Sequence, residues 1–207
     1  MGSRIMHLII ANQIAEQFSI QDRTSFLLGG IAPDAASSKE QSHFYTGDIN
    51  DYSRSIDFVE FLHKYDSYKY SNYILGYYTH LVADDLWLKG FYLAWLKNRM
   101  DNNQSILEQY HQDFRLLNGK LLNHYGLTSY LMKTLQHEGS ALDLDEVTIG
   151  NLYQFIPFVL EDMNFDPKYL DEPLTVFTFD QIVGYIETSI DKGIKHIHSL
   201  MRQSDVC

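Results

Sequence analysis

A histidine and an aspartate four residues apart mark one predicted helix as a candidate site for chemistry. Apolar and aromatic residues recur at helical spacing over residues 73–91, and His80 and Asp84 fall on the same stripe. A separation of four residues places both side chains on one helix face, close enough to share a ligand. A buried aspartate needs an opposite charge beside it, so either a distant basic residue or a metal ion is expected here.

Three further residues that could bind a metal come earlier in the chain. His7 falls on the inward face of a helix expected from Ser3 to about Phe18, where it is either a hydrogen-bonded core residue or a ligand. Asp34 follows Pro33, which predicts a constrained, semi-extended turn, and it is either a helix N-cap or a ligand. His43 is expected in a polar loop, where it is either solvated or functional.

These five side chains offer three imidazoles and two carboxylates. That set suits zinc, and iron, manganese or cobalt would also be accepted. Cysteine takes no part, which argues against a structural zinc of the finger type, whereas mixed His/Asp sites with an open water position are catalytic. Whether residues so far apart in the chain converge depends on the fold.

The elements that must position these residues are all predicted to be helical. The chain shows no convincing strand alternation and no repeats, which indicates an all-α multi-helix bundle. We expect a single domain over 1–207, with the ligands within 1–120 and the C-terminal helices of 129–203 completing the bundle. The expected helices are a short one over 22–28, one that starts at Ser55 or Asp57 and runs to about Tyr65, then 71–99, 105–125 and 129–136. They are followed by one from the acidic segment 143–146 to about 162 and a last one opened by a capping box at 178–181.

The amino-acid composition limits the classes of partner that the chain is expected to bind. The chain has 16 Lys and Arg against 27 Asp and Glu, a net charge of −11, which disfavours nucleic acid and anionic membrane surfaces as partners. A phosphate substrate held by a metal ion is still compatible, because the ion would dominate the local charge. The single cysteine, Cys207, allows no internal disulfide. No membrane span and no signal peptide are predicted, so a cytoplasmic protein is expected.

The order of the candidate ligands resembles that of the bacterial zinc-dependent phospholipase C family, which shares its fold with the S1/P1 nucleases. The similarity lies in His7 early in the first helix, Asp34 after Ile31-Ala32-Pro33, and the triplet His43-Phe44-Tyr45. It continues in the His80 and Asp84 pair with Gly76 and Tyr77-Tyr78 before it. The match covers about the first half of the chain, and its triplet and helical pair are the more specific features.

This resemblance implies a helical bundle of the phospholipase C/P1 nuclease type and a role for each ligand. Asp84 would bridge two ions, with His80, His43 and Asp34 on one ion and His7 on the other, and Asp34 would be a candidate general base. The family's third ion uses a histidine where this chain has Gly90, and then a His/Glu pair. Only His111 and Asp113 are available here, at another spacing, and residues two apart do not share a helix face. One or two ions are therefore expected.

These features predict a metal-dependent phosphoesterase that uses metal-activated water to cleave a phosphodiester or phosphomonoester. Its partner would be a small phosphoester or a lipid headgroup, and the oligomeric state stays open. One alternative is a non-catalytic helical protein that binds a metal. Another is an HD-type nucleotide phosphohydrolase, but that site needs adjacent His and Asp, and none of the nine histidines is followed by Asp.

Overall fold

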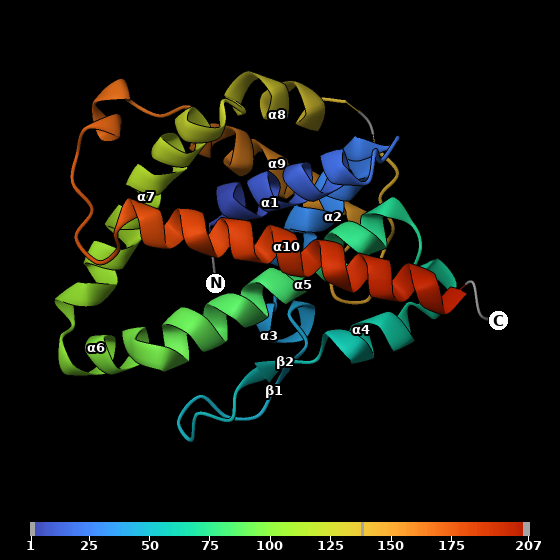
Figure 1. Ribbon diagram of the computed structural model, residues 1–207, viewed down its shortest axis with the longest axis horizontal. Helices are drawn as coiled ribbons and strands as arrows, with labels where there is room; N and C mark the ends of the chain where they lie inside the picture. Colours follow the sequence, from blue (N-terminus) through green and yellow to red (C-terminus); the bar gives the residue numbers. More distant parts are fainter. Residues whose placement is uncertain (1–2, 138, 205–207) are drawn as a thin grey trace.

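The computed structural model describes residues 3–137 and 139–204, and helices make up most of this part of the chain. Figure 1 shows the arrangement. The predicted all-α class is confirmed. The helices are α1 (Arg4–Gln17), α2 (Arg23–Ala35), α3 (Lys39–Ser42), α4 (Phe58–Lys64), α5 (Asn72–Trp87), α6 (Lys97–Asn102), α7 (Ser105–Tyr125), α8 (Thr128–Leu135), α9 (Ile149–Asp162) and α10 (Phe179–Ser204), with a π-helix at Leu88–Leu96 and 3₁₀ turns at Asp66–Tyr68 and Pro167–Leu170.

The loop after α3 contains a small hairpin that the sequence pattern did not predict. Strands β1 (Tyr45–Thr46) and β2 (Ser55–Ile56) pair antiparallel, with Tyr45 opposite Ile56. Each strand has only two residues, too short for an alternating pattern to be visible in the sequence. None of the described helices is long and apolar enough to cross a membrane.

Helices α1 and α5 form the centre of the core. In α5 every residue from Tyr73 to Asp84 is buried, and α1 is buried from Ile5 to Asn12. Helix α5 was expected to have one inward stripe, but it is covered on all sides, as is typical of a helix with apolar residues all round. Helix α10 packs across both α1 and α5, and α2 packs along α5 (Figure 1). His7 on α1 and His80 and Asp84 on α5 are therefore held inside the protein.

Helices α2 and α5 approach so closely that glycine is required at the contact. A Cβ at Gly76 would collide with the backbone carbonyl oxygen of Phe26, and one at Gly29 would collide with that of Tyr73. The contact positions the polar residues further along both helices, because His80 lies one turn after Gly76. Glycine costs helical propensity at both positions, and the close packing offsets that cost.

Helix starts were predicted well where a side chain caps the backbone. The Ser3 hydroxyl accepts the Met6 amide at 3.3 Å at the start of α1. At α10, the Gln181 amide donates to the Thr178 hydroxyl at 3.2 Å, and the Thr178 amide donates to the Gln181 side-chain oxygen at 2.9 Å. These contacts confirm the predicted capping box.

Two helix boundaries were predicted wrongly. Helix α2 does not stop near Leu28 but continues through Pro33 to Ala35, because burial against the core outweighs the weak propensity of this segment. Asp34 therefore lies in the last turn of a helix and is not an N-cap. The acidic segment does not begin α9 either. Thr148 caps that helix, and the Asp143 carboxylate accepts the Ile149 amide at 2.7 Å from outside it.

Candidate metal centre

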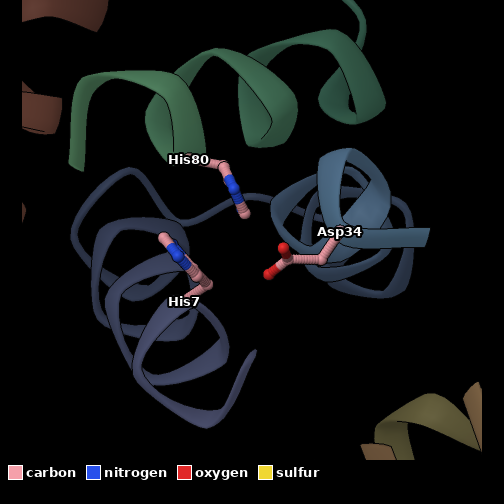
Figure 2. Close-up of side chains that lie close together, drawn as sticks. All are labelled: His7, Asp34 and His80. Carbon is pink, nitrogen blue, oxygen red and sulfur yellow. The ribbon is translucent and has the colours of Figure 1, made fainter. Parts of the chain in front are cut away.

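The five residues singled out by the sequence converge on one buried point. Figure 2 shows His7 from α1, Asp34 from α2 and His80 from α5 pointing toward one another. One ligand atom from each lies within 4.8 Å of the others, and His43, His80 and Asp84 form a second such group. The two groups share His80. The rings of His7 and His80 stack with centroids 3.7 Å apart.

Asp84 lies between the imidazoles. Its Oδ1 is 3.2 Å from His7 Nε2, and its Oδ2 is 3.2 Å from His43 Nε2 and 3.7 Å from His80 Nε2. The side chains of Asp84 and His7 are each 1% exposed. One carboxylate thus faces histidines on both of its oxygens, which is the geometry of a residue able to bridge two cations.

The hydrogen-bond network determines which ring nitrogens are free to bind a metal. His80 Nδ1 lies 2.8 Å from the Gly30 carbonyl oxygen, which can only accept, so Nδ1 carries the proton. The Ser42 hydroxyl donates to the Pro33 carbonyl at 2.8 Å, so it accepts from His43 Nδ1 at 2.9 Å. When either ring is neutral, its Nε2 is therefore unprotonated and has a lone pair that can bind a metal. Backbone and hydroxyl partners of this kind orient metal-binding histidines.

The Nε2 nitrogens of these two rings face each other. His43 Nε2 and His80 Nε2 are 3.3 Å apart, and both point at the Asp84 carboxylate. Lone pairs at this separation repel unless a positive charge lies between them. Ligands about 2.0–2.1 Å from a tetrahedral zinc lie roughly 3.3 Å from one another, so the observed spacing accommodates such an ion. The buried His7 Nδ1 also has no hydrogen-bond partner in the described chain.

Asp34 connects the buried ligands to solvent. Its side chain is 10% exposed, and its Oδ1 lies 3.9 Å from His43 Nε2 and 2.7 Å from the ammonium group of Lys39. Lys39 is the first residue of α3, and His43 is the C-cap of the same short helix. His43 is fully buried, so it is not the solvated loop residue that was one of the two expectations.

The electrostatics of the cluster keep both carboxylates charged. Burial acts to raise the pKa of Asp34, but the positive charges of His80 and Lys39 outweigh it and lower that pKa below its ordinary value. Burial also opposes ionisation of Asp84, and its histidine neighbours contribute to lowering its pKa well below the ordinary range. For His80, burial lowers the pKa, whereas the Asp84 carboxylate raises it to a net value above the usual one. The cluster therefore favours positive charge at its centre.

The donor set fits a divalent metal ion. Three imidazoles and two carboxylates, without cysteine, suit zinc best, and the site has oriented donors and a route to solvent through Asp34. The cluster could therefore bind a metal ion: His80 belongs to both ligand groups, and Asp84 contacts His7 of one group and His43 of the other.

His111 and Asp113, the weaker candidates, belong to neither ligand group. His111 is exposed and lines the cleft that Asp34 also lines. Asp113 is fully buried, and its carboxylate accepts the backbone amides of Thr175, Val176 and Phe177 at 2.7 to 3.1 Å. These charge-assisted hydrogen bonds account for the burial of Asp113 without a metal.

Replacing Asp113 by Ala should therefore destabilise the protein without releasing metal. Three backbone amides, two of them buried, would lose their acceptor, so we expect a loss of about 2 kcal/mol in the free energy of unfolding, measured by urea denaturation. The zinc content of the folded variant should equal that of the wild type. A variant that folds with wild-type stability but lacks metal would show that Asp113 is a ligand.

Sequence reasoning missed the residues that orient the ligands. The Gly30 carbonyl, the Ser42 hydroxyl and Lys39 have no recognisable motif, because each acts through the ring or carboxylate of another residue. Ser42 immediately precedes His43 and Lys39 lies four residues before it, and that proximity was the only indication available.

Fold and site together define a helical protein with a buried histidine/aspartate cluster suited to a divalent metal. The family model described as zinc dependent phospholipase C matches residues 6–190. The chain therefore belongs to the zinc-dependent phospholipase C family, and the match extends well beyond the half of the chain in which the resemblance was apparent. No curated protein and no solved structure matches the chain.

Proposed function

We propose that this protein is a zinc-dependent phosphoesterase that hydrolyses a phosphodiester of the phospholipid type. The observation that carries this proposal is that His43 Nε2 and His80 Nε2 lie 3.3 Å apart inside the core and both face the Asp84 carboxylate. Membership of a family of zinc-dependent phospholipases C supports the reaction class.

Each residue of the cluster has a distinct task in this proposal. His43, His80 and Asp84 hold the deepest part of the centre, and His7 closes it from α1. Zinc, when bound, supplies a Lewis acid for the phosphoryl oxygen and activates water at neutral pH. Asp34 is the ligand at the solvent side, so its carboxylate is placed to orient the attacking water or accept its proton.

Lys39 positions the Asp34 carboxylate. Its ammonium group holds Oδ1 at 2.7 Å from the side facing solvent. This ion pair favours the charged form of Asp34, which is the form that can bind a metal or accept a proton. We therefore assign Lys39 a positioning role and Asp34 a catalytic one.

Removal of the metal tests the proposal directly. Protein purified without chelating resin should contain one or two zinc ions per chain by X-ray fluorescence. Its hydrolysis of bis(p-nitrophenyl) phosphate should be lost after dialysis against a chelator and restored by added zinc, because the ion contributes several kcal/mol of transition-state stabilisation.

The same experiment distinguishes an enzyme from a binding protein. A full complement of zinc without turnover of any phosphodiester or phosphomonoester would favour a non-catalytic metal-binding protein. Hydrolysis that persists in the fully metal-free protein would contradict the proposed mechanism.

A further inference from the structure

A cleft of about 590 Å³ opens beside the metal centre and has Asp34 in its wall. Its other walls come from the start of α1, from α3, from the middle of α7 and from α9. Because Asp34 is also the partly exposed member of the cluster, a substrate that reaches the metal through this cleft would place its headgroup against α7 and α9.

The cleft concentrates positive charge in an acidic protein. It is lined by Arg4, Lys39 and Arg115, although the whole chain carries a net charge of −11. Lys39 is paired with Asp34, and Arg4 is paired with Asp162 at 2.8 Å. Arg115 is exposed and forms no ion pair with any residue that the structure describes. The α7 wall thus offers a guanidinium whose charge is not neutralised.

A second polar group on the same wall has an unused hydrogen-bonding capacity. Asn118 lines the cleft and is 7% exposed, and its Oδ1 has no hydrogen-bond partner in the described part of the chain. It lies three residues after Arg115 in α7, so both side chains are on the same helix face. Buried polar groups are as a rule satisfied, so this amide suits a polar ligand.

The aromatic rings of the cleft do not favour a cationic headgroup. A quaternary ammonium group binds over open aromatic faces. The Arg4 guanidinium already lies 5.0 Å from the centroid of the Phe155 ring. Tyr110 and Phe114 pack on each other with centroids 4.4 Å apart. A choline group would meet these rings beside the unneutralised charge of Arg115.

We propose that the cleft selects phosphodiesters whose headgroup carries its own negative charge, with Arg115 binding that charge and Asn118 a neighbouring polar group. This proposal rests on the proposed hydrolase function and adds the class of substrate that the enzyme would select. Arginine suits the role because its planar fork binds a phosphate or carboxylate with two hydrogen bonds. A positive cleft also attracts such substrates in an otherwise acidic protein.

The test compares two short-chain lipids, dihexanoyl phosphatidylinositol 4-phosphate and dihexanoyl phosphatidylcholine, as substrates of the zinc-loaded protein. The wild type should have the higher kcat/KM for the phosphorylated lipid. Arg115→Gln should reduce the ratio of the two kcat/KM values roughly tenfold, mainly through KM, because it removes a charge-assisted contact with the headgroup. Arg99→Gln is the matched control, since Arg99 is exposed elsewhere on the surface, and its ratio should equal that of the wild type.

A preference for phosphatidylcholine, or a ratio unaffected by Arg115→Gln, would overturn the proposed selectivity while leaving the hydrolase function intact. Calorimetry with inositol 1,4-bisphosphate provides a readout that needs no turnover. If no ester is hydrolysed, but inositol 1,4-bisphosphate binds and Arg115→Gln weakens that binding, the anion site is supported and the hydrolase proposal is contradicted. If the soluble diester glycerophosphoinositol 4-phosphate is cleaved with the same kcat/KM as the phosphorylated lipid, the same selectivity is supported. The substrate would then be a free phosphodiester instead of a lipid.

Discussion

Replacing His80 and Asp84 together by alanine should leave a protein that binds no zinc and hydrolyses bis(p-nitrophenyl) phosphate roughly 1000-fold more slowly, a loss of about 4 kcal/mol in transition-state stabilisation. The reason is geometric. His80 belongs to both ligand groups, and Asp84 contacts imidazoles through both of its oxygens. Removing the pair takes ligands from every position that an ion could occupy.

A matched pair of the same residue types serves as the control. His63 and Asp66 are both exposed, so His63→Ala with Asp66→Ala should keep wild-type zinc content and activity. If the buried double variant does not fold, the nearly isosteric Asp84→Asn provides the second measurement. Full zinc content in the folded His80/Asp84 variant would refute the assignment of the metal centre.

Gly76→Ala should strongly destabilise the protein at the contact between α2 and α5. The new Cβ would collide with the backbone of Phe26, which no side-chain rotation relieves. Overpacking of a core typically costs 1–3 kcal/mol, and we expect about 3 kcal/mol here because backbone must move. For a chain of this size the midpoint of thermal unfolding should fall by about 6–10 °C, measured by calorimetry.

The opposite result is expected at Gly184, a glycine within α10 whose added Cβ would meet nothing within 4 Å. Gly184→Ala should stabilise the protein by about 0.5–1 kcal/mol through helix propensity alone. The zinc affinities of the two variants should also differ. Gly76→Ala should weaken zinc binding, because a shifted α5 would displace His80, whereas Gly184→Ala should leave the affinity unchanged. Wild-type stability in Gly76→Ala would mean that the two helices are not in close contact.

The amino-acid sequence by itself determined the helical class and the set of candidate ligands. Helical periodicity is local, so the register that places His80 and Asp84 on one face could be read without a structure. Capping residues such as Ser3 and Thr178 are local in the same sense, and the helices begin where they indicate. The types of the five side chains also restricted the metal, because donor chemistry does not depend on the fold.

The tertiary structure alone decided whether those side chains meet. Asp34 was expected in a turn and His43 in a polar loop, yet burial extends α2 to Ala35, and His43 caps α3 and is buried. The Gly30 carbonyl and the Ser42 hydroxyl, which accept from Nδ1 of His80 and His43 and so turn Nε2 of each ring toward the cluster, act on partners defined by three-dimensional contact. Distances between residues on different helices depend on how the helices cross, and that crossing is set by packing of the whole core, which no local pattern contains.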